Sequence, residues 1–226
     1  LWGVYRKDSG SIFMDGKGIG SMPADDARRH GITFVPQEIE LMEYMNVSEN
    51  IYVGKYPSRF GFVNWKKLNK QTNKIKQLFG RVIIGLNNET LVGDLSIANK
   101  QIIEILKVLA LDMKILCLDE PTSSLTKEES DRLFKLLLEL KKKGIPIIYV
   151  SHRIEEFIQI ADRVTVLKDG KYVMTKRIKD TSKDEIVNSM VGRDLSSGAE
   201  GIAILLTSDM NAIEVKDLNL TGDSKC

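Results

Sequence analysis

An entirely apolar run, Ile115–Leu118, ends in two adjacent carboxylates, Asp119 and Glu120. Four consecutive apolar residues, with Pro121 soon after them, are typical of a strand that is buried on both faces of a parallel sheet. Such a strand brings the two acids to its carboxyl end, where open α/β sheets bind ligands. A lone Asp-Glu pair more often caps a turn. The surrounding sequence therefore has to decide between a ligand site and a turn.

Strands and helices alternate through most of the chain, which predicts an α/β fold with a parallel sheet. The predicted strands are Ser11–Asp15, followed by a turn at Gly16–Gly18, then Ile32–Val35, Ile115–Leu118, Ile145–Val150, and a hairpin of Val164–Leu167 and Tyr172–Thr175. The predicted helices are Pro23–His30, Val47–Val53, Trp65–Phe79, Asn99–Leu111 with Ser96 as its cap, Lys127–Lys143 ended by Gly144, and Lys183–Val191. We also interpret Leu1–Tyr5 as the end of a helix.

A helical insertion interrupts this alternation. Two of the predicted helices flank Gly54–Val63, whose proline, glycines and aromatic residues are typical of a loop. We interpret about residues 47–111 as a helical subdomain.

Polar groups follow two other predicted strands. Gln37 and Glu38 come directly after Ile32–Val35 and Pro36, and His152 follows Ile145–Val150. Taken singly, Gln37 is an ordinary loop residue and His152 a capping or core histidine. Because the carboxyl ends of parallel strands meet at one sheet edge, we expect both beside the two acids. Carboxylates suit magnesium and a water beside a γ-phosphate, and imidazole can donate to a phosphate oxygen.

Three segments in this order resemble motifs of one family. Leu118–Thr126 is similar to the Walker B strand and D-loop of ATP-binding cassette (ABC) ATPases. Val35–Glu38 resembles the family's Q-loop, and Tyr149–Arg153 resembles its switch segment. The resemblance implies a P-loop NTPase-like ABC ATPase domain that binds ATP and Mg²⁺.

The same resemblance implies a role for each strand-end residue. Glu120 is expected to be the catalytic carboxylate. Asp119 and Gln37 are expected to hold the magnesium ion, and His152 to contact the γ-phosphate as a second catalytic group.

Asp94–Gln101 resembles the family signature, which in most members reads Leu-Ser-Gly-Gly-Gln before a helix. Here Ile97 and Ala98 replace the glycines, as in sugar-importer ATPases, and Asn99 replaces the glutamine. A serine hydroxyl and free amides at a helix N-terminus can hold an anion, so the opposing cassette's γ-phosphate is expected there. For Ser96 alone, a plain N-cap is the alternative. The nucleotide contacts implied by the signature and D-loop are Leu95, Ser96, Ile97, Ala98, Asn99, Ser124 and Thr126.

Further segments resemble the first half of tandem-cassette ATPases that serve monosaccharide importers. They are Asn46–Ile51, Gly61–Trp65, Ile160–Val164 and Met190–Arg193. The likeness makes residues 1–195 one ABC ATPase domain, 196–211 a linker, and 212–226 the first strand of a second cassette. It implies a peripheral location at the cytoplasmic face of the cell (inner) membrane. The expected partners are transmembrane permease subunits, the second cassette and, indirectly, a periplasmic or extracellular sugar-binding protein.

Composition gives no support to several other classes of protein. Lys and Arg total 33 against 31 for Asp and Glu, and the net charge of +2 is too balanced to predict a nucleic-acid partner or a polybasic membrane surface. Cys117 and Cys226 cannot form a disulfide framework. No apolar stretch reaches the ~18 residues of a spanning helix.

The family's phosphate loop, Gly-x-x-x-x-Gly-Lys-Ser/Thr, occurs nowhere in the sequence. We expect it just before Leu1, and we expect the 226-residue chain alone to bind ATP weakly and not to hydrolyse it. A nucleoside importer shares the same motifs. A soluble cassette protein working on ribosomes or DNA, and a truncated non-catalytic remnant, are the other hypotheses.

Overall fold

The computed structural model describes two compact units. Its described residues are 9–20, 24–79, 83, 85–111, 113–191, 202–206 and 213–216. Unit 1 comprises residues 1–33, 114–117 and 144–226, and unit 2 comprises residues 34–113 and 118–143. The predicted helix end at Leu1–Tyr5 lies outside the described residues.

The larger sheet has the strand order β3-β6-β7-β10-β8-β9. The strands are β3 (Ile32–Val35), β6 (Ile115–Asp119), β7 (Ile147–Ser151), β8 (Arg163–Lys168), β9 (Lys171–Arg177) and β10 (Ile202–Leu206). The last residues of β3 and β6 belong to unit 2. β10 is antiparallel to both β7 and β8, so these two strands run in the same direction. Helices and a sheet with parallel strands confirm the predicted α/β fold.

The smaller sheet of unit 1 has the order β11-β1-β2, and all its pairs are antiparallel. β1 (Ser11–Met14) and β2 (Lys17–Ile19) are joined at Asp15 and Gly16. The turn predicted at Gly16–Gly18 is therefore misplaced. The backbone φ angles of Asp15 and Gly16 are +51° and +72°, as in the tight Asp-Gly turns that join antiparallel strands.

Short helices complete unit 1. They are α1 (Ala24–Arg29), α6 (Ile154–Phe157) and α7 (Lys183–Val191). The hairpin of β8 and β9 turns at Asp169 and Gly170, both with positive φ, as the sequence predicted.

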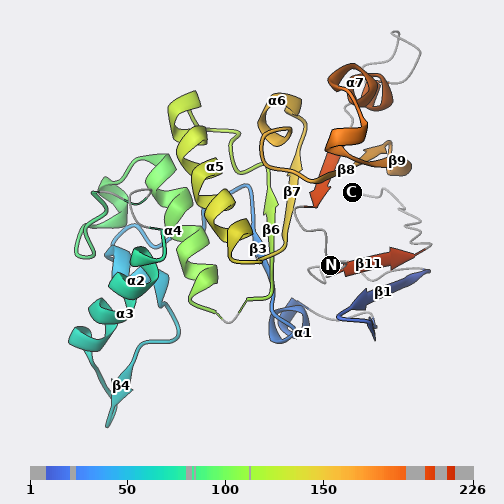
Figure 1. Cartoon of the computed structure of the whole chain (residues 1–226). Helices are drawn as coiled ribbons and strands as arrows, with labels where there is room; N and C mark the ends of the chain where they lie inside the picture. The colour runs from blue at the N-terminus through green and yellow to red at the C-terminus, as the bar shows by residue number, and fades with distance from the viewer. Residues whose placement is uncertain are drawn as a thin grey trace, which may run out of the picture. The chain divides into compact units, whose positions relative to one another are not determined.

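The described part of unit 2 is mainly helical, and Figure 1 shows its α-helices α2 to α5 on the same side of the larger sheet's strand β6. They are α2 (Val47–Ile51), α3 (Trp65–Gln77), α4 (Ile97–Leu109) and α5 (Lys127–Lys142). α2 packs on α3 and α4, and α4 packs on α3 and α5. Buried Ile103, Ile105 and Leu106 of α4 supply much of this core, and each such side chain contributes about 1.5–3 kcal/mol when fully buried.

Side chains fix where these helices begin. Asn46 and Glu49 form a reciprocal capping box on α2, which satisfies backbone N–H groups that have no partner within the helix. The predicted cap at Ser96 is confirmed, although α4 begins two residues before Asn99. α5 ends before Gly144, whose φ of +76° suits a residue without a Cβ.

Two segments differ from the predictions. Gly54–Val63, predicted as a loop, contains the hairpin of β4 (Ser58–Arg59) and β5 (Phe62–Val63). Strands of two residues are too short to show a sequence period. Ile202–Leu206, within the expected linker, forms β10, and its continuous apolar run is a strand signal of the same kind as Ile115–Leu118 that the sequence prediction missed. The alternating segment at residues 212–218 does contain a strand, β11 (Ile213–Lys216), which pairs with β1.

Across the described ranges, no helix combines the length and the apolar character that crossing a membrane requires.

Candidate functional site

β6 holds Asp119 as its last residue, at the boundary between buried strand and turn. Leu116 and Leu118 are fully buried, whereas Asp119 is half-buried. Glu120 follows with a φ of +42°, a left-handed conformation that is uncommon outside glycine. Its carbonyl oxygen accepts a hydrogen bond from the Ser123 backbone N–H at 3.1 Å, which closes a tight turn. The two carboxylates therefore stand on a fixed turn rather than on a loose loop.

The surroundings of Asp119 disfavour its ionised form. Burial, and secondarily the neighbouring Glu120 carboxylate, raise the pKa of Asp119 above its ordinary value. Both effects disfavour the ionised form, and a nearby cation would oppose them. Among the described residues, no group of three or more His, Cys, Asp or Glu could form a metal site. Asp119 still suits magnesium, because Mg²⁺ beside a nucleotide is typically held by one or two carboxylates, phosphate oxygens and water.

Gln37 lies two residues beyond β3, and its side chain is exposed. β3 and β6 are neighbours in the sheet. The carbonyl oxygen of Gly31, which precedes β3, accepts hydrogen bonds from Lys114 N–H at 2.8 Å and Ile115 N–H at 3.1 Å at the start of β6. Asp119 is the last residue of β6 and Gln37 follows β3, so both lie at the ends of adjacent strands.

The chain after Gln37 is tied to helix α4. The backbone N–H of Glu40 donates to Glu104 Oε1 at 2.9 Å, and Lys107 Nζ donates to the Glu40 carbonyl oxygen at 3.0 Å. Glu104 is only 4% exposed, and burial raises the pKa of its carboxyl group although Lys107 opposes the shift. Sequence reasoning missed Glu104, because its partner lies far away in the sequence and no local pattern marks it.

Asn50 is a second residue that sequence reasoning missed, and its side chain holds the loop before α2. The Asn50 side chain accepts from Met42 N–H at 2.8 Å and donates to the carbonyl oxygens of Met42, Met45 and Asn46 at 3.0 to 3.2 Å. Asn50 is almost completely buried. Its amide therefore fixes the loop from Met42 to Asn46 against α2.

The predicted signature forms the start of α4. Ser96 Oγ accepts from the Asn99 backbone N–H at 3.4 Å, which is the ordinary N-cap contact. Ile97 is 48% exposed and Ala98 is buried, while Leu95 and Asn99 are half-buried. Of these positions, Ser96 and Ile97 present the most accessible surface.

The two D-loop candidates differ in their surroundings. Ser124 is exposed. Thr126 is the N-cap of α5: its Oγ1 accepts from Glu129 N–H at 3.3 Å, and its own N–H donates to Glu129 Oε2 at 3.1 Å. The Thr126 hydroxyl therefore caps α5, a structural role that was not predicted for it from the sequence.

His152 belongs to unit 1, whereas Gln37, the two acids, the signature and the D-loop candidates belong to unit 2. It follows β7 directly, and its side chain is exposed after the buried Ser151. Ser151 Oγ accepts from Arg153 N–H at 3.0 Å, which shapes the turn at the strand end.

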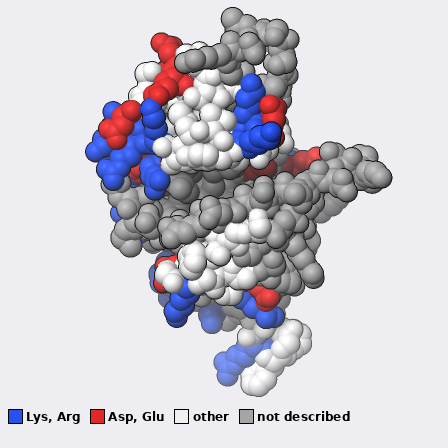
Figure 2. Space-filling model, turned by 90° about the vertical axis from the view of Figure 1, so that its right-hand side faces the viewer, with Lys and Arg blue, Asp and Glu red and all other residues white. Residues whose placement is uncertain are grey.

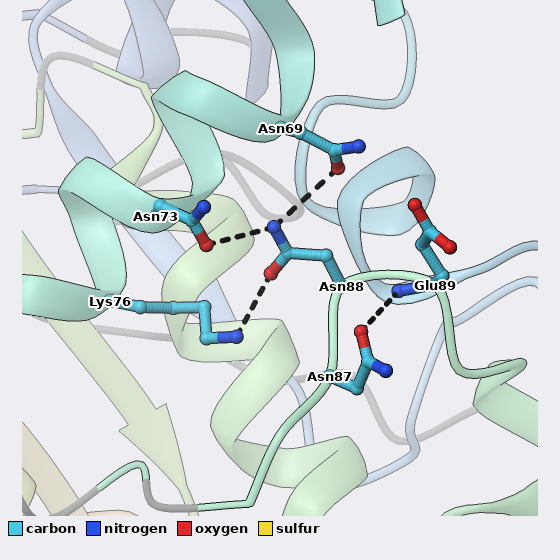
Figure 3. Close-up of a pocket in the computed structure, with 6 residues that line it drawn as sticks. All are labelled: Asn69, Asn73, Lys76, Asn87, Asn88 and Glu89. Atoms are coloured by element: carbon cyan, nitrogen blue, oxygen red, sulfur yellow. Dashed lines mark hydrogen bonds between the residues drawn. The ribbon is translucent and has the colours of Figure 1, made fainter. Parts of the chain in front are cut away.

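A polar pocket of about 300 Å³ in unit 2 lies between α3 and the loop before α4. Its lining residues are Asn69, Asn73, Lys76, Asn87, Asn88 and Glu89. Figure 3 shows Asn88 at its centre: the Asn88 amide donates to Asn73 Oδ1 at 2.9 Å, and Asn88 Oδ1 accepts from Lys76 Nζ at 2.9 Å. Lys76 also donates to the Leu86 carbonyl oxygen. None of the predicted site residues lines this pocket.

Comparison with known proteins identifies the family. The sequence pattern that defines ABC transporters matches residues 1–123, more than half of the chain. The chain belongs to the ABC transporter family. Among solved structures, this ABC chain is similar to cbiO1 of Clostridium perfringens, part of the ABC transporter complex cbiONQ. The identity is 26% and the TM-score 0.67, over 84% of this chain and 75% of cbiO1. This similarity confirms the predicted ABC ATPase fold.

Curated relatives of this ABC chain are named as sugar import proteins. It is 41% identical to a "Putative ribose/galactose/methyl galactoside import ATP-binding protein 1" of Burkholderia ambifaria, over 97% of the chain and 42% of that protein. It is 42% identical to the "Ribose import ATP-binding protein RbsA" of Bacillus licheniformis, over 87% of the chain and 39% of RbsA. The chain thus spans about two fifths of the length of the curated relatives it matches.

Proposed function

We propose that the chain is part of the ATP-binding and ATP-hydrolysing cassette of an importer for monosaccharides of the ribose and galactose type. The observation that supports this most is the fixed turn after β6, where Asp119 and Glu120 stand together in a chain of the ABC family. The printed names of the relatives support the choice of sugars.

The residues at the strand ends divide the tasks of the proposed reaction among them. Asp119 and Gln37 hold the Mg²⁺ of Mg·ATP, which neutralises charge on the phosphates. Glu120 accepts a hydrogen bond from the attacking water and orients it toward the γ-phosphate. His152 donates a hydrogen bond to a γ-phosphate oxygen and stabilises charge that develops during transfer.

The signature and D-loop residues act on a nucleotide shared between two cassettes. Ser96 and the amides at the start of α4 bind the γ-phosphate of the opposing cassette, because a helix N-terminus attracts anions. The remaining proposed nucleotide contacts are Leu95, Ile97, Ala98, Asn99, Ser124 and Thr126. The opposing cassette is a second cassette, and we propose that its first strand lies in residues 212–226, after a connecting segment, residues 196–211, that contains β10.

The proposed partners follow from coupling hydrolysis to uptake. The cassette binds transmembrane permease subunits at the cytoplasmic face of the membrane, and a sugar-binding protein delivers cargo to the permease from the other side. The 226-residue chain alone is proposed to bind ATP weakly, because its sequence has no phosphate loop.

Uptake measurements test this proposal. Cells lacking the gene are complemented with the wild-type complete gene product or with its Glu120→Gln variant, and the uptake of labelled ribose, galactose and guanosine is followed. The proposal expects the wild-type gene to restore uptake of a sugar and Glu120→Gln not to. Restoration of guanosine uptake alone would contradict the choice of cargo, and full uptake with Glu120→Gln would contradict the role of the carboxylate.

A further inference from the structure

Positive charge is concentrated in one segment of unit 2, although the whole chain is nearly neutral. Eight Lys or Arg residues and no Asp or Glu lie between Glu49 and Glu89. The overall charge of +2 therefore conceals a local excess that whole-chain composition did not predict. The segment includes the β4–β5 hairpin and α3.

Four lysines of this segment form a stripe along α3. Lys66, Lys67, Lys70 and Lys74 are exposed, whereas Leu68 and Thr72 on the opposite face are buried. Residues spaced by three, four and seven or eight lie on one side of a helix. None of the four lysines forms an ion pair with any residue in the described ranges. Lys76 faces the asparagine pocket instead (Figure 3), so it is not part of the stripe.

Exposed aromatic side chains lie on the hairpin and at the N-terminal end of α3. Phe60 is 87% exposed, Phe62 is 80% exposed and Trp65 is 53% exposed. The Arg59 guanidinium lies over the Phe60 ring, 5.3 Å from its centroid. Figure 1 shows the hairpin projecting from unit 2 below α3, and the same projection at the bottom of Figure 2 shows basic and uncharged atoms without acidic ones.

The hairpin is anchored to the helix that it precedes. Asn64 N–H donates to the Pro57 carbonyl oxygen at 2.7 Å, and the rings of Tyr56 and Trp65 lie 6.4 Å apart between centroids. The hairpin and α3 are thus held together, and we call their exposed basic and aromatic side chains the basic-aromatic face: Arg59, Phe60, Phe62, Trp65, Lys66, Lys67, Lys70 and Lys74.

We propose that the basic-aromatic face docks on the surface of an anionic phospholipid bilayer. Lysines near such a surface are attracted by the negative potential of its headgroups, and exposed aromatic rings are favoured at the level where headgroups meet acyl chains. Charge complementarity and the protruding aromatic tip both fit a broad negative surface. A single-stranded nucleic acid would instead be expected to stack its bases on aromatic rings lining a basic groove, whereas Phe60 and Phe62 lie at a projecting hairpin. This surface goes beyond the proposed transport function and needs neither nucleotide nor permease.

Vesicle binding by the 226-residue chain tests the proposal. Sedimentation with phosphatidylglycerol/phosphatidylcholine vesicles should recover the protein, and pure phosphatidylcholine vesicles should not. Replacing all four stripe lysines by Gln should lower the partition coefficient at least ~20-fold, since each lysine near the surface contributes roughly fivefold. Salt near ~1 M should release the protein, because screening then acts over about 3 Å. Phe60→Ser with Phe62→Ser should also weaken binding.

A matched control removes the same charge elsewhere. Lys127, Lys135, Lys171 and Lys179 are exposed and lie outside the face, and their replacement by Gln should change binding less than ~3-fold. With Trp2→Phe, Trp65 is the remaining tryptophan, and its emission should shift to shorter wavelength on anionic vesicles. Urea unfolding of each variant establishes that it is folded. Equal loss in both lysine variants, equal binding to neutral vesicles, or binding through the stripe to an oligonucleotide but not to vesicles would overturn the proposal.

Discussion

The Glu104 carboxylate accepts a hydrogen bond from the backbone N–H of Glu40 at 2.9 Å. Glu104 lies on the helix that follows the signature, and Glu40 lies three residues after Gln37. One buried carboxylate thus joins two segments for which nucleotide contacts are proposed. Because both belong to unit 2, a change at the signature helix can reach the chain next to Gln37 through this bond.

Glu104→Ala should destabilise the fold by about 1–3 kcal/mol, because the Glu40 N–H loses its acceptor. Glu104→Gln keeps an acceptor and should be much closer to wild type. Urea unfolding followed by circular dichroism measures both. Equal destabilisation by Ala and Gln would show that the hydrogen bond is not what Glu104 contributes.

The raised pKa of Glu104 makes the free energy of unfolding depend on pH. On raising the pH, the unfolded chain releases this proton first, at its ordinary pKa of 4.5, and the folded chain releases it later. The unfolded state then binds fewer protons, so this group lowers stability as pH rises through the window above 4.5. Wild type should therefore gain stability relative to Glu104→Gln when the pH falls from ~7 to ~4. A relative loss on acidification would contradict the assigned shift.

Asn50→Ala should destabilise the protein by about 1–3 kcal/mol, since it takes from the Met42 backbone N–H its side-chain acceptor and removes the hydrogen bonds that the buried Asn50 amide donates to the Met42–Asn46 loop. Cleavage of this loop by a protease should also become faster. Asn87→Ala is a suitable control, because Asn87 is exposed, and its effect should stay within about 0.5 kcal/mol. Similar effects of the two substitutions would refute a special role for the Asn50 amide.

Cys117 should be unreactive in the folded protein. Burial in β6 raises the pKa of its thiol to about 12, and the thiolate is the reactive form. In a Cys226→Ser background, iodoacetamide at neutral pH should label Cys117 at least ~100-fold more slowly in buffer than in concentrated urea. Native labelling at the rate of an exposed thiol would contradict the burial of this strand.

Thr126→Ala should cost about 1 kcal/mol through loss of the α5 capping box, whereas Thr126→Ser should retain the cap. Ser124→Ala, two residues away and exposed, should leave the free energy of unfolding unchanged. Thermal unfolding compares the three variants. If Ser124→Ala destabilised as much as Thr126→Ala, the turn rather than the cap would be the source of the effect.

Most of the strands and helices that carry a clear local sequence signal were predicted correctly. Ile115–Leu118 shows its strand by an unbroken apolar run, and α5 shows its end by Gly144. The β4–β5 hairpin was missed because its two-residue strands have no period, whereas β10 was missed although its five-residue apolar run is the same kind of signal as that of Ile115–Leu118. In the site, the acids after β6 and Gln37 were predicted from strand ends.

The remaining features depend on long-range contacts. Glu104 is an ordinary helix glutamate in sequence, and only the fold places Glu40 against it. Asn50 likewise reads as one polar residue in a short helix. The basic-aromatic face was hidden because acidic residues elsewhere balance the net charge, so composition could not reveal that the segment between Glu49 and Glu89 has no acid.

ATP hydrolysis by the complete gene product decides whether Glu120 polarises the attacking water. Glu120→Gln should lower kcat by about 10²–10⁴-fold while nucleotide binding persists, because the amide keeps the size of the side chain but cannot accept the proton. Glu128→Gln, an exposed acid in the first turn of α5, should leave kcat within about twofold of wild type. Wild-type hydrolysis by Glu120→Gln would contradict the assignment of the turn after β6 as the catalytic site.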